Sequence, residues 1–380
     1  MSEALPPGST IGIIGGGQLG RMSAMAAARL GYRVHIFAPE ADNPAARVAA
    51  AATVAAYDDL AALERFADQV DAVTFEFENV SAAACAALER HRPVRPSAKV
   101  LAISQDRLLE KRFLNQAGVA TAPWAAIETA ADLAGAAQKI GFPAVLKTTR
   151  LGYDGRGQAR VANADELATA FARLEPKPLV LEGFVNFACE LSAIVARGPN
   201  GEMAGFEAVE NRHHHHILHA TFAPARVVPE AAQAAEAAAR RIAEAIGLVG
   251  LLAVEFFLAA DGTLLANEIA PRPHNSGHWT IEACTESQFA LHIRAVAGLP
   301  LPDPHRHADA VMLNLVGPEE FSRWPEILAT PGLSAHHYGK TEARPGRKVG
   351  HVTRLFPLGA LPGDAGVAAA FAPVPLYTAD

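Results

Sequence analysis

Two glutamates in adjoining apolar segments place the strongest constraint on the fold. Glu255 lies in LLAVEFF, Glu268 lies in LLANEIA, and the Asp261-Gly262 dipeptide between them is a preferred two-residue turn of an antiparallel hairpin. Such a turn pairs residue 260 with residue 263 and, counted back along the strands, Glu255 with Glu268. Two opposed carboxylates in such apolar strands repel each other and lose hydration, at a cost of several kcal/mol if they stay unpaired.

A divalent cation shared by Glu255 and Glu268 would remove this repulsion. Ligation by carboxylate, water and phosphate oxygens suits Mg²⁺ better than zinc. Asn267, beside Glu268, is a candidate further ligand. The alternative is that each glutamate lies at the rim of a sheet and pairs with a lysine or arginine.

A lysine and a glycine-rich loop form the second feature. Lys147 lies in the apolar strand predicted at 144–149, and the loop that follows contains Gly152, Tyr153, Asp154, Gly155, Arg156, Gly157 and Gln158. Glycines let backbone N–H groups approach a phosphate chain, and Lys147 and Arg156 supply positive charge. No helix follows, so the loop is neither a Walker loop nor a dinucleotide fingerprint. It favours a lid over a triphosphate, with a simple tight hairpin as the alternative.

A hinge is predicted after the strand at 178–182. In Glu182-Gly183-Phe184-Val185, main-chain groups could pair with a flat base, and Glu190 could accept hydrogen bonds from ribose hydroxyls. The alternative is that these residues simply form part of a strand and its end, without binding a ligand.

The N-terminal segment carries a competing signal. Gly15, Gly17 and Gly20 follow an apolar strand as G-x-G-x-x-G, and Glu40 has the spacing of a ribose-binding acid. This pattern alone favours a nicotinamide-binding domain or a phosphate-binding loop at a helix N-terminus. Glu76 and Glu78 close a later strand of the same sheet, where open α/β sheets bind ligands, so one of them is a candidate substrate contact.

Two further polar segments could bind anions. The segment APRPHNSGHW directly follows the proposed metal strand, and GKTEARPGRKVGH forms a basic turn that could hold a phosphate monoester or lie free in solvent. Their candidate residues are Arg272, His274, Asn275, Ser276 and His278 in the first segment, and Lys340, Arg344, Arg347 and Lys348 in the second.

A run of four histidines, His213 to His216, lies within an alternating stretch in the middle of the chain. Side chains in a strand alternate between faces, so the four cannot share one ion. We expect a mainly structural role, with one histidine lining a nucleotide site.

Length and composition limit the class of protein. A chain of 380 residues should divide into two or three units, here predicted as 1–118, 119–186 and 187–380. The net charge of -7 argues against nucleic acid as a partner, and the most apolar run, 248–260, is too short to span a membrane. The three cysteines fit free buried thiols better than disulfides or a zinc site. We therefore expect a cytoplasmic protein.

The motifs together resemble a known family, the 5-(carboxyamino)imidazole ribonucleotide synthases, which are ATP-grasp enzymes of purine synthesis. The resemblance extends from about Ile11 to His351 and rests on IGIIGGGQLGRM, TFEFENV, QDR, GYDGRGQ, NEIAPRPHNSGHW and RPGRKVGH. It implies an ATP-grasp fold of α/β and α+β class: an N-terminal open parallel α/β domain, a small lid and a larger C-terminal α+β domain. The four-histidine run departs from the family.

The resemblance also implies roles for individual residues. For ATP it implies Arg107, Lys147, Tyr153, Asp154, Gly155, Arg156, Gly157, Gln158, Glu182, Gly183, Phe184, Val185, Glu190, His213, Asn267 and Glu268. For Mg²⁺, expected as two ions, it implies Glu255 and Glu268. For the aminoimidazole ribonucleotide and bicarbonate it implies Gly17, Gln18, Leu19, Glu76, Tyr153, Arg156, Arg272, His274, Asn275, Ser276, Lys340, Arg347 and Lys348, of which Arg156, Arg272 and His274, with Asp154, are the expected catalytic residues.

The reaction that the resemblance implies is an ATP-dependent carboxylation through carboxyphosphate, in a homodimer. Three alternatives remain open: another ATP-grasp ligase with a different substrate, a nicotinamide oxidoreductase, and a nucleotide-binding sensor without catalysis.

Overall fold

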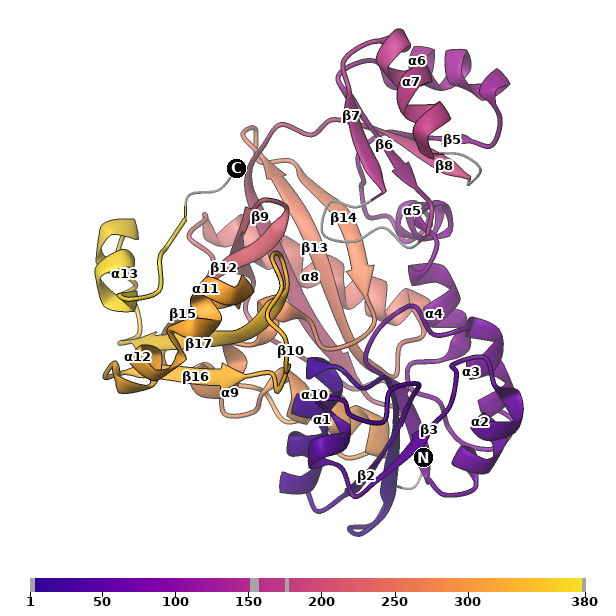
Figure 1. Cartoon of the computed structure of the whole chain (residues 1–380). Coiled ribbons are helices and arrows are strands. Elements are labelled where there is room, and N and C mark those ends of the chain that lie inside the picture. The colour runs from indigo at the N-terminus through magenta and orange to yellow at the C-terminus, as the bar shows by residue number, and fades with distance from the viewer. Residues whose placement is uncertain (1–3, 151–156, 175–177, 378–380) are drawn as a thin grey trace.

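The chain is described by a computed structural model that covers residues 4–150, 157–174 and 178–377. Within these ranges the strands form three sheets, each covered by its own helices (Figure 1). In the described part of the chain, no helix is both long enough and apolar enough to cross a membrane. Its three cysteines are free thiols, of which Cys85 and Cys284 are buried and Cys189 is partly exposed.

The first sheet is parallel, and its strands are β1 (Thr10–Ile14), β2 (Arg33–Ala38), β3 (Ala51–Val54) and β4 (Ala72–Phe75), in the order β3-β2-β1-β4. Its helices are α1 (Gln18–Arg29), η1 (Ala46–Val48), α2 (Leu60–Ala67), α3 (Ala82–Leu88) and α4 (Ala98–Ser104). The next helix, α5 (Arg107–Gln116), buries Leu114 in the core of the third and largest sheet. β1 and β4 are almost wholly buried, as expected when helices cover both faces of a parallel sheet. Because β1 and β4 are parallel neighbours, the glycine loop and Glu76 follow at the same sheet edge.

The second sheet is small and antiparallel. Its strands are β5 (Trp124–Ile127), β6 (Ala144–Thr148), β7 (Gln158–Val161) and β8 (Leu179–Gly183), in the order β5-β8-β6-β7, with η2 (Ala130–Asp132), α6 (Leu133–Ile140) and α7 (Ala164–Leu174). Leu146 and Leu181 pack with the helices on one face. Because strand side chains alternate, Lys147 and Glu182 lie on the opposite face of the sheet.

The third sheet is the largest. Its strands are β9 (Phe187–Arg197), β10 (Met203–Gly205), β11 (Val209–His214), β12 (Ile217–Ala223), β13 (Gly250–Ala259), β14 (Leu264–Ala270), β15 (Asp309–Val316), β16 (Leu333–His337) and β17 (Lys348–Phe356). They follow the order β14-β13-β9-β11-β12-β15-β17-β16, with β10 beside β9. Its helices are α8 (Pro229–Ile246), η3 (Asn275–Gly277), α9 (Thr280–Ala283), α10 (Gln288–Ala297), α11 (Gly317–Ser322), α12 (Trp324–Ala329) and α13 (Asp364–Phe371).

Two helices cover opposite faces of this sheet. α8 begins at Pro229, ends before Gly247 (φ +69°), and packs Ile242 and Ile246 against β9 and β13. α10 packs Leu291 against the other face, and its far side buries Ile293 against β1 of the first sheet. α10 therefore joins the N-terminal unit to the large sheet (Figure 1).

The histidine run is only partly in a strand, so the prediction that it alternates throughout is wrong. His213 and His214 end β11, whereas His215 and His216 form the two-residue loop of the β11–β12 hairpin with φ angles of 51° and 62°. A two-residue hairpin loop with two positive φ angles normally contains Asn-Gly, because larger side chains cost about 1 kcal/mol per residue in this conformation.

Replacing this loop by the residues its backbone prefers should stabilise the protein. For the double variant His215→Asn, His216→Gly we expect the free energy of unfolding to rise by about 1–2 kcal/mol, because the left-handed conformation no longer strains two histidines. Urea unfolding measures the change. His305→Asn, at an exposed position outside any hairpin turn, is the matched control. Equal or lower stability of the double variant than of the control would contradict this reading of the loop.

Candidate active site

The hairpin of β13 and β14 brings Glu255 and Glu268 directly opposite each other. The predicted pairing is confirmed, but the predicted two-residue turn is wrong. Ala259 N–H donates to Thr263 O (2.9 Å), so the loop has three residues and ends on Gly262 with φ +86°. Asn267 is then the extra residue of a β-bulge, which restores the pairing of the two glutamates beyond it.

The two carboxylates are held in contrasting electrostatic environments. Glu255 Oε1 lies 3.2 Å from His274 Nε2, and Glu268 Oε2 lies 3.2 Å from Arg107 Nη1. Burial, followed by repulsion from Glu268, raises the pKa of Glu255 to about 7. Burial also acts to raise the pKa of Glu268, but Arg107 and Lys147 outweigh it and hold that pKa below its usual value. A cation between the two oxygens would relieve the repulsion, so the residues present fit a hard divalent ion such as Mg²⁺.

Positive charge gathers around Glu182 beside this pair. Glu182 Oε2 accepts from Lys147 Nζ (3.0 Å) and lies 3.2 Å from Lys111 Nζ, which is 1% exposed. Burial acts to raise the pKa of Glu182, but Lys147, Lys111 and Arg107 together lower it to about 2. Three cations facing this one carboxylate leave positive charge that suits a polyphosphate.

Helix α5 contributes residues that the sequence reasoning missed. Besides Arg107 it supplies Lys111 and Glu110, whose Oε1 accepts from Ile269 N–H (2.7 Å) next to Glu268. Burial, followed by repulsion from Glu268, raises the pKa of Glu110 to about 8. The available signal was the spacing of charged residues at i, i+3 and i+4 in QDRLLEKRFL, which places all three on one helix face.

The N-terminal glycine loop holds a carboxylate of the protein itself. The N–H groups of Gly17 and Gly20 donate to Glu76, the second at 2.7 Å, and a Cβ atom on Gly15 would overlap the Glu76 side chain. Burial raises the pKa of Glu76 although these two N–H groups act to lower it. Glu76 thus takes the place at the α1 N-terminus where a dinucleotide fingerprint holds pyrophosphate, and Glu40 is exposed. The geometry disfavours a nicotinamide cofactor.

The segment after β14 is fixed by polar contacts from several elements. His274 Nδ1 accepts from Ser276 N–H (3.3 Å), which leaves the ring proton on Nε2 to donate to Glu255. Asn275 exchanges two hydrogen bonds with Asn314 of β15, at 2.9 and 2.6 Å. These contacts fix the segment in which the His274 imidazole lies next to Glu255.

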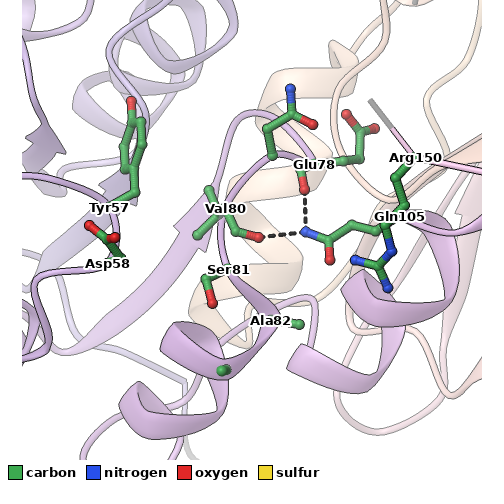
Figure 2. Close-up of a pocket in the computed structure, with 10 residues that line it drawn as sticks. Tyr57, Asp58, Glu78, Val80, Ser81, Ala82, Gln105 and Arg150 are labelled. Carbon is green, nitrogen blue, oxygen red and sulfur yellow. Dashed lines mark hydrogen bonds between the residues drawn. The ribbon is translucent and has the colours of Figure 1, made fainter. Parts of the chain in front are cut away.

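A cavity of about 630 Å³ lies between the first and second units. Figure 2 shows Gln105 on one side of it, donating to the carbonyl oxygens of Glu78 and Val80, with Tyr57 and Asp58 on the other. Arg272 contacts one of the lining residues, because its Nε lies 2.7 Å from Glu78 Oε1. The cavity therefore adjoins the residues predicted to surround the substrate.

The basic turn and the histidine run hold several of the remaining predicted residues. Lys340 Nζ donates to Lys348 O (2.7 Å), and Lys348 acts on the pKa of Glu255, whereas Arg347 Nη1 donates to Glu342 O (3.2 Å) within its own turn. His213 forms an ion pair with Glu190, which links the histidine run to another predicted ATP residue.

The glycine-loop residues Tyr153, Asp154, Gly155 and Arg156 lie outside the described residues. Gln158 of the same loop pairs with Lys147, and Gly157 (φ +71°) accepts from Thr148 N–H (2.8 Å).

At the hinge, Gly183 ends β8, Phe184 lies under the Arg160 guanidinium at 4.1 Å, and Val185 is partly exposed. Gln18 and Leu19 begin α1 beside Gly17.

A second group of residues that can bind metals consists of Glu282, His336 and His351. His336 Nε2 already contacts Glu282 Oε1 at 2.6 Å, and the two imidazoles are stacked with an interplanar angle of 9° and centroids 4.5 Å apart. Lone pairs of stacked rings run parallel and do not converge on one ion, so the cluster is better explained as an ion pair with a stacked neighbour.

Family models match three successive parts of the chain. Residues 9–105 match the ribonucleotide synthetase preATP-grasp domain, residues 112–289 the ATP-grasp domain, and residues 310–357 the phosphoribosylaminoimidazole carboxylase C-terminal domain. The expected fold class, an ATP-grasp fold of α/β and α+β class with an open parallel N-terminal domain, is confirmed.

Similar proteins share this arrangement over nearly their whole length. N5-carboxyaminoimidazole ribonucleotide synthase of Brucella melitensis is 51% identical over 93% of this chain and 98% of its own. The ADP complex of the Staphylococcus aureus synthetase has a TM-score of 0.89 at 39% identity, covering 93% of this chain and 94% of that one. The Aspergillus clavatus synthase in complex with ADP and 5-aminoimidazole ribonucleotide has a TM-score of 0.86 at 32% identity, covering 92% and 94%.

The paired glutamates, the adjoining cations and the matched domains define an ATP-dependent carbon–nitrogen ligase of the ATP-grasp class. Within that class, the chain belongs to the N5-carboxyaminoimidazole ribonucleotide synthase family.

The cation cluster around Glu182 predicts a large stability effect. Replacing Glu182 by Gln leaves the almost fully buried Lys111 without a counter-charge, so we expect the free energy of unfolding to fall by about 3–5 kcal/mol. Urea unfolding measures the loss, with Glu342→Gln at an exposed ion pair as the matched control that should change little. A Glu182→Gln protein as stable as that control would show that the cluster is not electrostatically coupled.

Proposed function

We propose that this chain uses ATP to join bicarbonate to the amine of 5-aminoimidazole ribonucleotide, giving N5-carboxyaminoimidazole ribonucleotide, ADP and phosphate in purine biosynthesis. The observation that carries the proposal is the opposition of Glu255 and Glu268 beside Arg107 and Lys147, because it combines a hard-cation site with charge for a triphosphate. The names of the relatives and the bound ligands of the Aspergillus clavatus complex support the choice of substrate.

In the first step, a bicarbonate oxygen attacks the γ-phosphorus of ATP. The bond from that phosphorus to the β,γ-bridging oxygen breaks, which releases ADP and forms carboxyphosphate. Arg107 and Lys147 would stabilise charge on the phosphoryl oxygens. Glu255 and Glu268 would hold Mg²⁺, which supplies further neutralisation of that charge when bound. His274 acts here as a neutral hydrogen-bond donor, because burial lowers its pKa well below the usual value.

In the second step, the substrate amine attacks the carboxyl carbon of carboxyphosphate. The bond from that carbon to the phosphate oxygen breaks, and the phosphate leaves with the proton that the amine loses. We assign the surroundings of this step to Arg272, Glu76, Lys340 and Lys348, with Asn275 and Ser276 fixing the local backbone. The family resemblance alone assigns four further residues to this step: Tyr153, Asp154, Arg156 and Arg347.

The assembly and the number of ions are also part of the proposal. The family resemblance supports a homodimer in the cytoplasm that binds two Mg²⁺ ions per site, one of them shared by Glu255 and Glu268. We place the nucleotide base at the hinge Gly183 to Val185 and its ribose at Glu190 and His213, whose ion pair closes that side of the site.

Omitting one substrate at a time tests the proposed reaction. ADP release should require both bicarbonate and the aminoimidazole ribonucleotide at full rate, and each omission should reduce it at least tenfold. Turnover that is independent of bicarbonate would favour an ATP-grasp ligase with another substrate. Nucleotide binding without ADP release would favour a sensor, and NAD binding without ATPase activity an oxidoreductase.

Glu268→Gln should remove turnover while the protein stays folded. The variant keeps the side-chain shape but loses a metal-ligand charge, so we expect ADP formation to fall by at least about 100-fold at saturating Mg²⁺. Glu244→Gln, on the exposed face of α8, makes the same chemical change away from the site and should keep full activity. Near-normal ADP formation by Glu268→Gln would refute the proposed metal site.

A further inference from the structure

The first residue of α10 reaches back into the active-site segment. Gln288 is fully buried, and its backbone N–H donates to Thr280 Oγ1 (3.0 Å). α10 is the helix that joins the N-terminal sheet to the large sheet, so its start is fixed from both sides. The contacts of Gln288 itself are with the segment of His274 to Thr280.

The carboxamide of Gln288 makes three hydrogen bonds. Its Oε1 accepts from His274 N–H (2.9 Å), and its Nε2 donates to His274 O (2.7 Å) and lies 3.0 Å from His278 Nδ1. The two bonds to His274 satisfy both main-chain groups of that residue, as a neighbouring strand would do. A carboxamide is suited to this because it presents an acceptor and a donor side by side.

The surrounding chain is shaped around this carboxamide. A Cβ atom on Gly277 would lie 2.5 Å from Gln288 Oε1, so only glycine leaves room for it. Thr280 Oγ1, which accepts from the Gln288 backbone, donates to Gly277 O (2.6 Å). Gln288 and the loop of His274 to Gly277 thus form one closely packed, hydrogen-bonded unit.

We propose that Gln288 is a positioning residue for the metal site, acting through His274. By fixing the His274 backbone it sets the direction of the imidazole, whose Nε2 lies 3.2 Å from Glu255 Oε1. Loss of the carboxamide would let His274 turn and would free Glu255 from its orientation toward Glu268. The inference rests on the proposed function, because it assigns Gln288 to the geometry of the proposed Mg²⁺ site.

Three variants separate positioning from simple helix stability. Gln288→Met keeps the size but removes all three hydrogen bonds, and Gln288→Glu keeps the shape. Ser287→Ala removes the N-cap of the same helix, which accepts from Ala290 N–H (3.1 Å), without touching His274. The measurements are kcat, the KM for the aminoimidazole ribonucleotide, and Mn²⁺ affinity of the ADP-bound protein by electron paramagnetic resonance.

For Gln288→Met we expect kcat and Mn²⁺ affinity each to fall by about 10–100-fold, the usual effect of removing a partner of a metal-ligand network. The values for Ser287→Ala, including its KM for the ribonucleotide, should stay within about twofold of wild type. Gln288→Glu should regain activity relative to wild type as the pH falls from 8.5 to 6.5, because a buried carboxyl has a raised pKa and its neutral form mimics the carboxamide.

Two outcomes would overturn the inference. One is a Gln288→Met protein with Mn²⁺ affinity equal to that of Ser287→Ala. The other, which still applies if Gln288→Met does not fold, is a Gln288→Glu protein whose activity relative to wild type does not change with pH. Failure of the proposed function would instead appear as wild-type protein without bicarbonate-dependent ADP release.

Discussion

The opposition of two carboxylates in the middle of an apolar hairpin is the constraint on which this structure depends. Glu255 and Glu268 would repel each other strongly without compensation, so the surrounding elements supply opposite charge and hydrogen-bond donors. Arg107 arrives from α5, and His274 from the segment after β14. The bulge at Asn267 keeps the two glutamates level although the turn is one residue longer than a tight hairpin needs.

The charged residues around Glu182 come from two different units of the fold, as expected for an ATP-grasp enzyme with a small lid. The small sheet brings Lys147 and Glu182, and α5 brings Lys111 between that sheet and the hairpin, so the cluster bridges two units. The N-terminal unit uses its glycine loop differently, because Glu76 already takes the hydrogen bonds of Gly17 and Gly20. A loop with the pattern of a dinucleotide site therefore fixes a carboxylate near the proposed substrate residues.

The sequence predicted the elements that depend on local patterns and missed those that depend on packing. The strand of β1 and the helix α8 follow from periodicity and from the residues at their ends. The pairing of Glu255 with Glu268 was predicted from a two-residue turn, and it holds because the bulge in β14 offsets the extra residue of the loop. The burial of Glu110 does not follow from a local pattern, because its partner Ile269 is distant in the chain. The turn formed by His215–His216 lacks the glycine or asparagine signal from which such turns are predicted, and no glycine marks the bulge. The individual site assignments remain predictions.

The most direct test of the central claim is to locate the metal. Crystals grown with ADP and Mn²⁺, which has anomalous scattering and the oxygen preference of Mg²⁺, would show the ion as a peak in the anomalous difference map. Our account predicts a peak within about 2.0–2.3 Å of a carboxylate oxygen of both Glu255 and Glu268. A well-occupied ion bound to the nucleotide but to neither glutamate would contradict it.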